Sequence, residues 1–99
     1  MSELTDRVMQ IVESIPAGRV MTYGAVAQEA RTGARVVARV LHGGGHQIPW
    51  WRVVNAEGCP YPKAAPDARD HFIDEATPLL DENDNVRVDL TSASWTLGE

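Results

Sequence analysis

Apolar residues recur every three or four positions near the start of the chain, and this spacing predicts an amphipathic helix. The apolar positions of this face are Leu4, Val8, Ile11, Val12 and Ile15. Ser2 can act as the N-cap of the helix, which is expected to run to about Ser14. The sequence Pro16-Ala17-Gly18 ends it, because proline and glycine interrupt helices.

Two further short helices are predicted between residues 22 and 42. Thr22 can cap a helix that runs from Tyr23 to about Glu29. Thr32 can cap the next helix, which is expected to run from Gly33 to His42. Two short helices joined by a tight turn are typical of a helix-turn-helix.

The second helix of this pair has two different faces. One face has the spacing of core residues and consists of Val37, Val40 and Leu41. The opposite face consists of Arg35, Ala38, Arg39 and His42. Spacing alone fits a groove-binding face and an ordinary solvated face, so both interpretations stay open. Three glycines at residues 43–45 stop the helix.

The second half of the chain combines short strands, turns and one helix. Arg52-Val53-Val54 predicts a strand, and the turn that follows it places Gly58 at positive φ. The proline-rich segment Cys59–Lys63 predicts an ordered loop. A fourth helix is predicted to begin at Pro66 and to kink or end at Pro78. The remaining elements are an acidic turn at 81–85, a strand at Val86–Leu90 and a tail containing Trp95.

These elements predict a mainly α fold with a small β-hairpin element, organised as a winged-helix-like helix-turn-helix domain. A length of 99 residues favours a single domain over residues 1–99, with the helix-turn-helix at about 22–42. No apolar run approaches the roughly 20 residues that a membrane span needs, and the first ten residues do not resemble a signal peptide. We expect a cytoplasmic monomer, nucleoid-associated if the source is bacterial.

Cysteine and histidine usage limits the possible chemistry. The lone Cys59 excludes an internal disulfide and a zinc site built on paired cysteines. The three histidines are scattered along the chain, so we expect neither a metal site nor another cofactor.

Charge is distributed unevenly along the chain. Residues 1–52 hold six arginines and four acids, a net charge of +2. Residues 53–99 hold three basic residues and ten acids, a net charge of −7. This asymmetry fits a local DNA-binding face on an acidic body, and equally an acidic tail on a neutral domain. With so few cations, affinity for ordinary DNA should be weak and salt-sensitive.

The most distinctive stretch is Ile48-Pro49-Trp50-Trp51-Arg52-Val53-Val54, which follows the segments 20–27 and 33–41. In this order the three segments resemble the C-terminal domain of O6-alkylguanine-DNA alkyltransferases, over about residues 5–63. The resemblance is closer to the alkyltransferase-like proteins, in which tryptophan replaces the alkyl-accepting cysteine. An indole has no ionisable nucleophile, so Trp50 at this position cannot form a covalent adduct.

The resemblance implies the fold of that C-terminal domain, with a helix-turn-helix that binds the minor groove. Arg35 matches the family arginine that enters the base stack in place of an extruded nucleotide. Tyr23 matches the tyrosine that crowds the phosphate backbone and helps to rotate the nucleotide. Arg39, one turn after Arg35, is expected either to contact the phosphate or groove or to be simply solvated.

The resemblance also implies a lesion pocket near Trp50. Trp50 either offers apolar surface to the alkylated base or fills the pocket as core. Trp51 replaces the family histidine, which removes the general base, and is expected to pack. Lys63 aligns with a basic residue that lies beside the lesion base. The residues that complete the motif are Pro49, Arg52, Val53, Asn55 and Gly58. Of these, Arg52 is expected to be structural and Asn55 to stabilise the turn.

The chain also departs from the alkyltransferases. Their asparagine after the recognition helix is absent, because its place falls within the glycines at 43–45. Their acidic relay residue is sought among Asp81, Glu82 and Asp84. Cys59 lies in a loop with no adjacent base, which makes it a poor alkyl acceptor.

The sequence therefore predicts a non-enzymatic protein that binds duplex DNA, flips O6-alkylguanine toward Trp50 and holds it unreacted. The resemblance implies nucleotide excision repair proteins as partners, with the acidic C-terminal third as a candidate partner face. Two alternatives stay open. One is an active alkyltransferase that uses Cys59, and the other is a helix-turn-helix regulatory or interaction module without lesion preference.

Overall fold

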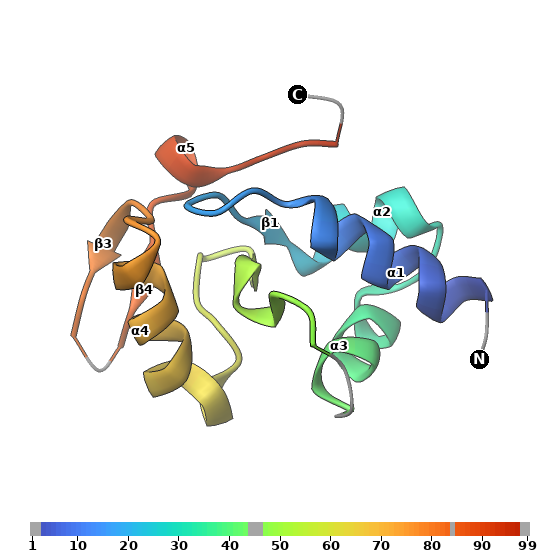
Figure 1. Cartoon of the computed structure of the whole chain (residues 1–99), viewed down its shortest axis with the longest axis horizontal. Coiled ribbons are helices and arrows are strands. Elements are labelled where there is room, and N and C mark those ends of the chain that lie inside the picture. Colours follow the sequence, from blue (N-terminus) through green and yellow to red (C-terminus); the bar gives the residue numbers. More distant parts are fainter. Residues whose placement is uncertain (1–2, 44–46, 84, 98–99) are drawn as a thin grey trace.

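The structure, a computed structural model, describes residues 3–43, 47–83 and 85–97. Two groups of elements lie toward opposite ends of its longest axis, which extends 37 Å (Figure 1). The first group is helical and consists of α1 (Glu3–Ser14), α2 (Tyr23–Ala30) and α3 (Ala34–His42). The second group consists of α4 (Ala65–Asp74), β3 (Leu79–Asp81) and β4 (Arg87–Val88). The elements between and above them are β1 (Met21–Thr22), β2 (Val53–Val54), α5 (Leu90–Ala93) and the 3₁₀ helix η1 (Trp50–Arg52). A second 3₁₀ helix, η2 (Pro62–Ala64), directly precedes α4.

The mainly helical fold and the three N-terminal helices are confirmed, with one correction at a helix start. Thr22 caps α2 as predicted, because its extended backbone lets its hydroxyl accept a hydrogen bond from the Ala25 amide at 3.1 Å. The N-cap of α3 is Gly33, without a side-chain cap, and Thr32 does not serve this role. The Thr32 amide instead donates to the Ala27 carbonyl at 2.9 Å, which closes the end of α2. The predicted cap Ser2 and the glycines 44 and 45 lie outside the described residues.

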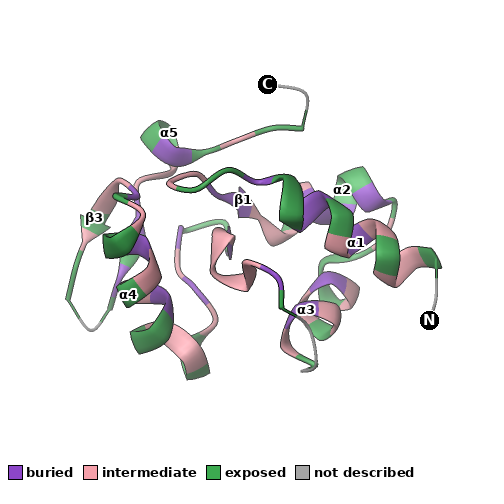
Figure 2. Cartoon of the chain, viewed as in Figure 1, coloured by how far each residue is buried: buried purple, intermediate pink, exposed green. Residues whose placement is uncertain are grey.

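The buried apolar residues form two cores. The first lies under α1, α2 and α3, and its members are Val8, Ile11, Val12, Ile15, Met21, Val26, Ala27, Ala30, Val37, Leu41, Ile48 and Val53. The second lies against α4, and its members are Val20, Val54, Ala68, Phe72, Val86, Val88 and Ala93. Figure 2 shows the consequence for the helices, because α1 and α4 are each buried on one side and exposed on the other.

The parallel pair of β1 and β2 divides the two cores. Met21 pairs with Val53, and both side chains belong to the first core. The neighbouring residues Val20 and Val54 belong to the second core. Successive side chains of an extended segment point to opposite faces, so two neighbouring residues of each segment are enough to serve both cores.

The strand predicted at Arg52–Val54 begins one residue late, because Arg52 is part of the 3₁₀ helix η1. The strand predicted at Val86–Leu90 is only Arg87–Val88. Leu90 instead begins α5, because the Asp89 side chain caps that helix by accepting from the Thr91 amide at 3.1 Å.

The fourth helix also differs from its predicted bounds. It begins at Ala65 and ends at Asp74, four residues before Pro78. The end is set by Ala76, whose φ is +57°, and by a hydrogen bond from the Thr77 amide to the Phe72 carbonyl at 2.9 Å. The chain then continues into the strand β3, which was not predicted and pairs antiparallel with β4.

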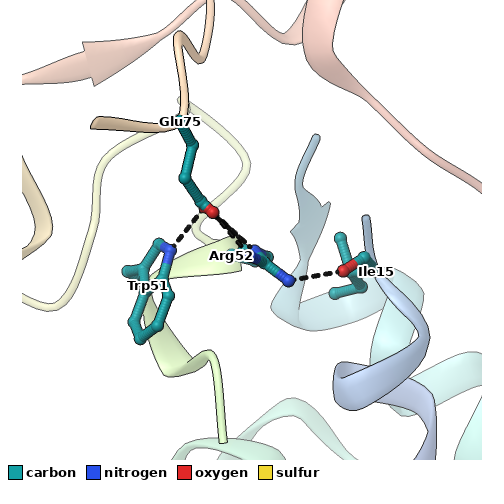
Figure 3. Close-up of polar contacts among 4 residues, drawn as sticks. All are labelled: Ile15, Trp51, Arg52 and Glu75. Carbon is teal, nitrogen blue, oxygen red and sulfur yellow. Dashed lines mark hydrogen bonds and ion pairs between the residues drawn. The ribbon is translucent and has the colours of Figure 1, made fainter. Parts of the chain in front are cut away.

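Three side chains connect the two cores (Figure 3). Arg52 donates through Nη2 to Glu75 Oε2 at 2.6 Å and through Nη1 to the Ile15 carbonyl at 2.8 Å. The Trp51 indole N–H donates to Glu75 Oε1 at 2.8 Å. Glu75 is the C-cap of α4, and Ile15 follows the last residue of α1. We call Trp51, Arg52 and Glu75 the carboxylate clamp.

The carboxylate clamp holds Glu75 in its ionised form. Burial acts to raise the pKa of the Glu75 carboxyl. The hydrogen bonds from Arg52 and Trp51, and the nearby charges of Arg52 and His71, outweigh burial, so the pKa is lowered below its ordinary value.

Replacing Gly58 by alanine should destabilise the fold by about 2 kcal/mol or more. Gly58 has a φ of +88°, and an added Cβ would lie 2.4 Å from the Val88 carbonyl oxygen. Gly24→Ala is the matched control, because nothing lies within 4 Å of its added Cβ and alanine favours the helix α2. Urea unfolding of the two variants checks this. A Gly58→Ala protein as stable as the wild type would contradict it.

Glu75→Gln should lower the free energy of unfolding by about 1–3 kcal/mol at pH 7, because Arg52 loses its charged acceptor. The folded pKa of Glu75 is lowered, so its contribution is present above the unfolded pKa of about 4.3 and disappears as pH falls through the folded pKa. The difference between wild type and variant should therefore shrink from pH 7 to pH 3. Urea unfolding at both pH values measures it, with the exposed Glu29→Gln as control. An equal difference at both pH values would refute this role.

Candidate nucleic-acid interface

Most of the arginines are engaged within the molecule. Arg7 donates to the Ala30 carbonyl at 2.9 Å, and Arg19 donates to the carbonyls of Ala93 and Ser94. Arg52 belongs to the carboxylate clamp. Of the other two engaged arginines, Arg69 donates to the main-chain carbonyl of Glu82 and Arg87 donates to that of Glu57.

The remaining cations are Arg31, Arg35, Arg39 and Lys63, and all four are exposed. Among the described residues, none of these four side chains makes a hydrogen bond or an ion pair. The three arginines lie on the turn and on α3, so they belong to the helix-turn-helix. We call these three the arginine stripe. Guanidinium groups without a partner can bind phosphates without breaking any contact of the fold.

Tyr23 is the first residue of α2, and its hydroxyl lies 2.7 Å from Nε2 of His42 at the end of α3. Burial, together with the neighbouring Tyr61 hydroxyl, raises the pKa of Tyr23 to about 12. Burial lowers the pKa of His42. At neutral pH the phenol is therefore protonated and donates, and the neutral imidazole accepts.

Trp50 lies between two stacked pairs of rings. On one side the His42 ring stacks on Tyr61, with centroids 4.0 Å apart and planes 13° apart. On the other side the Trp51 ring stacks on His71, with centroids 3.7 Å apart and planes 7° apart. Trp50 meets His42, Trp51 and His71 edge-on, at 6.3, 5.7 and 6.0 Å. This offset and edge-on geometry is the favoured one for aromatic groups.

An open cavity of about 500 Å³ lies on one side of η1. Its lining residues are Glu13, Gln47, Ile48, Pro49, Trp50, Trp51 and Arg52. Its volume falls in the range of small-molecule sites. The structure thus joins Trp50 and Trp51 at one cavity, and joins Tyr23 to Trp50 through His42. Lys63 lies outside that lining, exposed in η2.

The other motif residues shape the backbone around Trp50. Pro49 is the N-cap of η1, and Val53 is buried in β2. The Asn55 side chain accepts hydrogen bonds from the amides of Glu57 and Cys59, both at 2.9 Å, which agrees with its predicted role in the turn. Gly58 has the positive φ that the turn was expected to need.

Several residues at this site were missed from the sequence. The carboxylate that contacts Trp51 is Glu75, and it was sought instead among Asp81, Glu82 and Asp84, the last of which lies outside the described residues. Glu75 ends α4 and carries no local motif, so only the tertiary fold reveals it. Arg31 could have been found, because the sequence shows it as a third arginine at the turn between the two helices.

Cys59 is a half-buried free thiol at a separate small cavity of about 230 Å³. The other residues that line this cavity are Pro60, Pro62, Ala65, Asn85 and Val86, none of which is a base. Within the described ranges, no group of three or more His, Cys, Asp or Glu side chains is placed to hold a metal ion. No helix in the described part of the chain is long and apolar enough to cross a membrane.

Known proteins resemble this chain in sequence and in fold. A protein named DNA base-flipping protein from Escherichia coli (strain K12) is 50% identical over 56 residues, which are 52% of this chain and 43% of that protein. One of the same name from Vibrio parahaemolyticus is 34% identical over 62 residues, 59% of this chain and 62% of that protein. The chain thus matches less than two thirds of the length of these relatives.

The fold is that of S. pombe Atl1, solved with damaged DNA containing O6-carboxymethylguanine. The TM-score is 0.85 at 24% identity, covering 97% of both chains. The family described as "6-O-methylguanine DNA methyltransferase, DNA binding domain" matches residues 3–77. This match extends over most of the chain and confirms the resemblance read from the sequence. The protein therefore belongs to the family of the 6-O-methylguanine DNA methyltransferase DNA-binding domain.

Proposed function

We propose that this protein recognises O6-alkylguanine in duplex DNA without repairing it. The observation that carries the proposal is the arginine stripe. Every arginine outside the helix-turn-helix is engaged within the molecule, whereas the side chains of Arg31, Arg35 and Arg39 are exposed and have no partner among the described residues. A net charge of −5 disfavours general DNA binding, so the stripe defines the surface that approaches the phosphates.

Nucleotide flipping is the mode of recognition that the site supports best. Arg35, near the start of α3, is free to enter the base stack, where a planar guanidinium partly replaces the lost stacking. Trp50 is only partly buried and offers an aromatic edge to the extruded base. The names of the bacterial relatives, and the damaged DNA bound by S. pombe Atl1, support the same mode.

The site lacks the groups that alkyl transfer requires. Trp50 has no nucleophile, and the Trp51 indole can donate to Glu75 but cannot act as a base. Cys59 lies at a cavity whose other lining residues include no base. The alkyl group therefore stays on the guanine, and its removal needs other proteins. We assign that step to nucleotide excision repair proteins, with the acidic C-terminal third as the face they contact.

Competition between a duplex with O6-methylguanine and the same duplex with guanine, at fixed salt, tests recognition. The wild-type protein should prefer the lesion, and Arg35→Ala should remove the preference. Arg39→Ala should lower the affinity for both duplexes by a similar factor and reduce the salt slope of binding by about 1. Arg87→Ala is the control, because Arg87 binds the Glu57 carbonyl away from the stripe. If Arg35→Ala lowers the affinity for both duplexes equally, the protein is a module without lesion preference.

Incubation with DNA that contains O6-methylguanine should leave the mass of the wild-type protein unchanged. Trp50→Cys should also remain unmodified, because Trp51 occupies the histidine position and its N–H is bonded to Glu75. Intact-protein mass spectrometry before and after incubation measures both. A mass increase of one methyl group on the wild type would establish an alkyltransferase, and Cys59→Ser would then identify the acceptor.

A further inference from the structure

We propose that the His42 imidazole occupies, in the free protein, the stacking place that the flipped base takes in the complex. The base then displaces His42 from Tyr61, and this displacement releases Tyr23. This inference rests on the proposed function, and it specifies the side of Trp50 on which the base binds.

The position of His42 on α3 supports the first step. Arg35, Arg39 and His42 are separated by four and three residues, so they lie along one side of the helix. This line begins at the arginine that would replace the extruded nucleotide and ends at the ring beside Trp50. A nucleotide turned out next to Arg35 therefore reaches Trp50 from the His42 side.

The open cavity lies on a different side of Trp50 and is less suited to the base. It is bounded by Glu13 of α1 and contains none of the four unpaired cations. The cation in its lining, Arg52, is already paired with Glu75, so the Glu13 carboxylate makes the cavity unfavourable for the phosphate that must accompany a flipped nucleotide. This cavity is thus not the site that we assign to the base.

The geometry of the His42–Tyr61 pair resembles that of a stacked base. The two rings are 4.0 Å apart and nearly parallel, and Trp50 closes the arrangement edge-on. An imidazole is the five-membered half of a purine, so a purine fits the same ring face with more stacking area. The histidine is half-buried, and what opposes its rotation outward among the described residues is its stack on Tyr61, its edge-on ring contacts and its hydrogen bond to Tyr23.

The hydrogen bond to Tyr23 couples base binding to backbone binding. While His42 stays in place, the Tyr23 hydroxyl donates to Nε2 at 2.7 Å and is not available to a phosphate. When the base displaces the imidazole, this hydroxyl becomes a free donor at the start of α2. Only a base that stacks better than the imidazole gains the Tyr23 contact. His42 is therefore a positioning residue that sets a threshold for flipping.

Binding of His42→Ala to the two duplexes tests the inference. Loss of the competing ring should raise affinity for the O6-methylguanine duplex by about three- to tenfold, the range of one stacked pair. Affinity for the guanine duplex, set by phosphate contacts, should stay within about twofold. His71→Ala, which removes the other stacked histidine, should not raise lesion affinity. Reduced or unchanged lesion affinity for His42→Ala would overturn the inference, as would an equal gain for His71→Ala.

Proton NMR of the His42 ring gives a second measurement on the wild-type protein. Its ring protons should be shifted upfield by Tyr61 in the free protein and in the guanine complex, and should lose this shift in the lesion complex. An upfield shift that persists with the lesion duplex would overturn this inference but not the proposed function. A wild-type protein without lesion preference would overturn the proposed function, and this inference with it.

Discussion

The fold depends on the opposite orientation of neighbouring side chains in two very short extended segments. Met21 and Val53 face the core under α1, α2 and α3, whereas Val20 and Val54 face the core against α4. The segment that carries Trp50 thus runs along the boundary of both cores, and Trp50 packs against each of them. The carboxylate clamp closes the same boundary by joining the ends of α1 and α4. A site for a large planar ligand needs this rigidity, because loosely held aromatic rings would collapse together.

Local signals predicted those parts of the fold that depend on neighbouring residues. Thr22 caps α2 and Asn55 folds the turn because each acts within four residues of itself. The strands β1 and β3 were missed, since two or three residues show no periodicity that a sequence can display. Thr32 was misplaced for a related reason. A threonine before a helix is a good cap. Here, however, the Thr32 amide closes the preceding helix by donating to the Ala27 carbonyl, and the next residue, Gly33, takes the cap position.

The sequence predicted those residues of the candidate site that belong to a recognisable motif. The residues Tyr23, Arg35 and Trp50 stand in recognisable segments, and the sequence placed them on the helix-turn-helix and the Pro-Trp-Trp stretch. Their partners were not predictable, because Glu75 comes from another helix and the spacing of His42 indicated only the face of the helix that it shares with Arg35 and Arg39. The sequence also could not separate bonded arginines from free ones. Arg87 and Arg39 differ only in what the tertiary fold brings near them.

The separation of charge along the molecule has a consequence for the approach to DNA. The arginine stripe lies toward one end of the longest axis, and the acids of α4 and β3 lie toward the other (Figure 1). Such a molecule has a permanent electric dipole, and the field of a polyanion exerts a torque on it before any atoms touch. Encounters that begin with the acidic end are repelled, and the rest are turned so that α3 leads. A protein with few free cations can thus convert a larger share of its collisions into aligned ones.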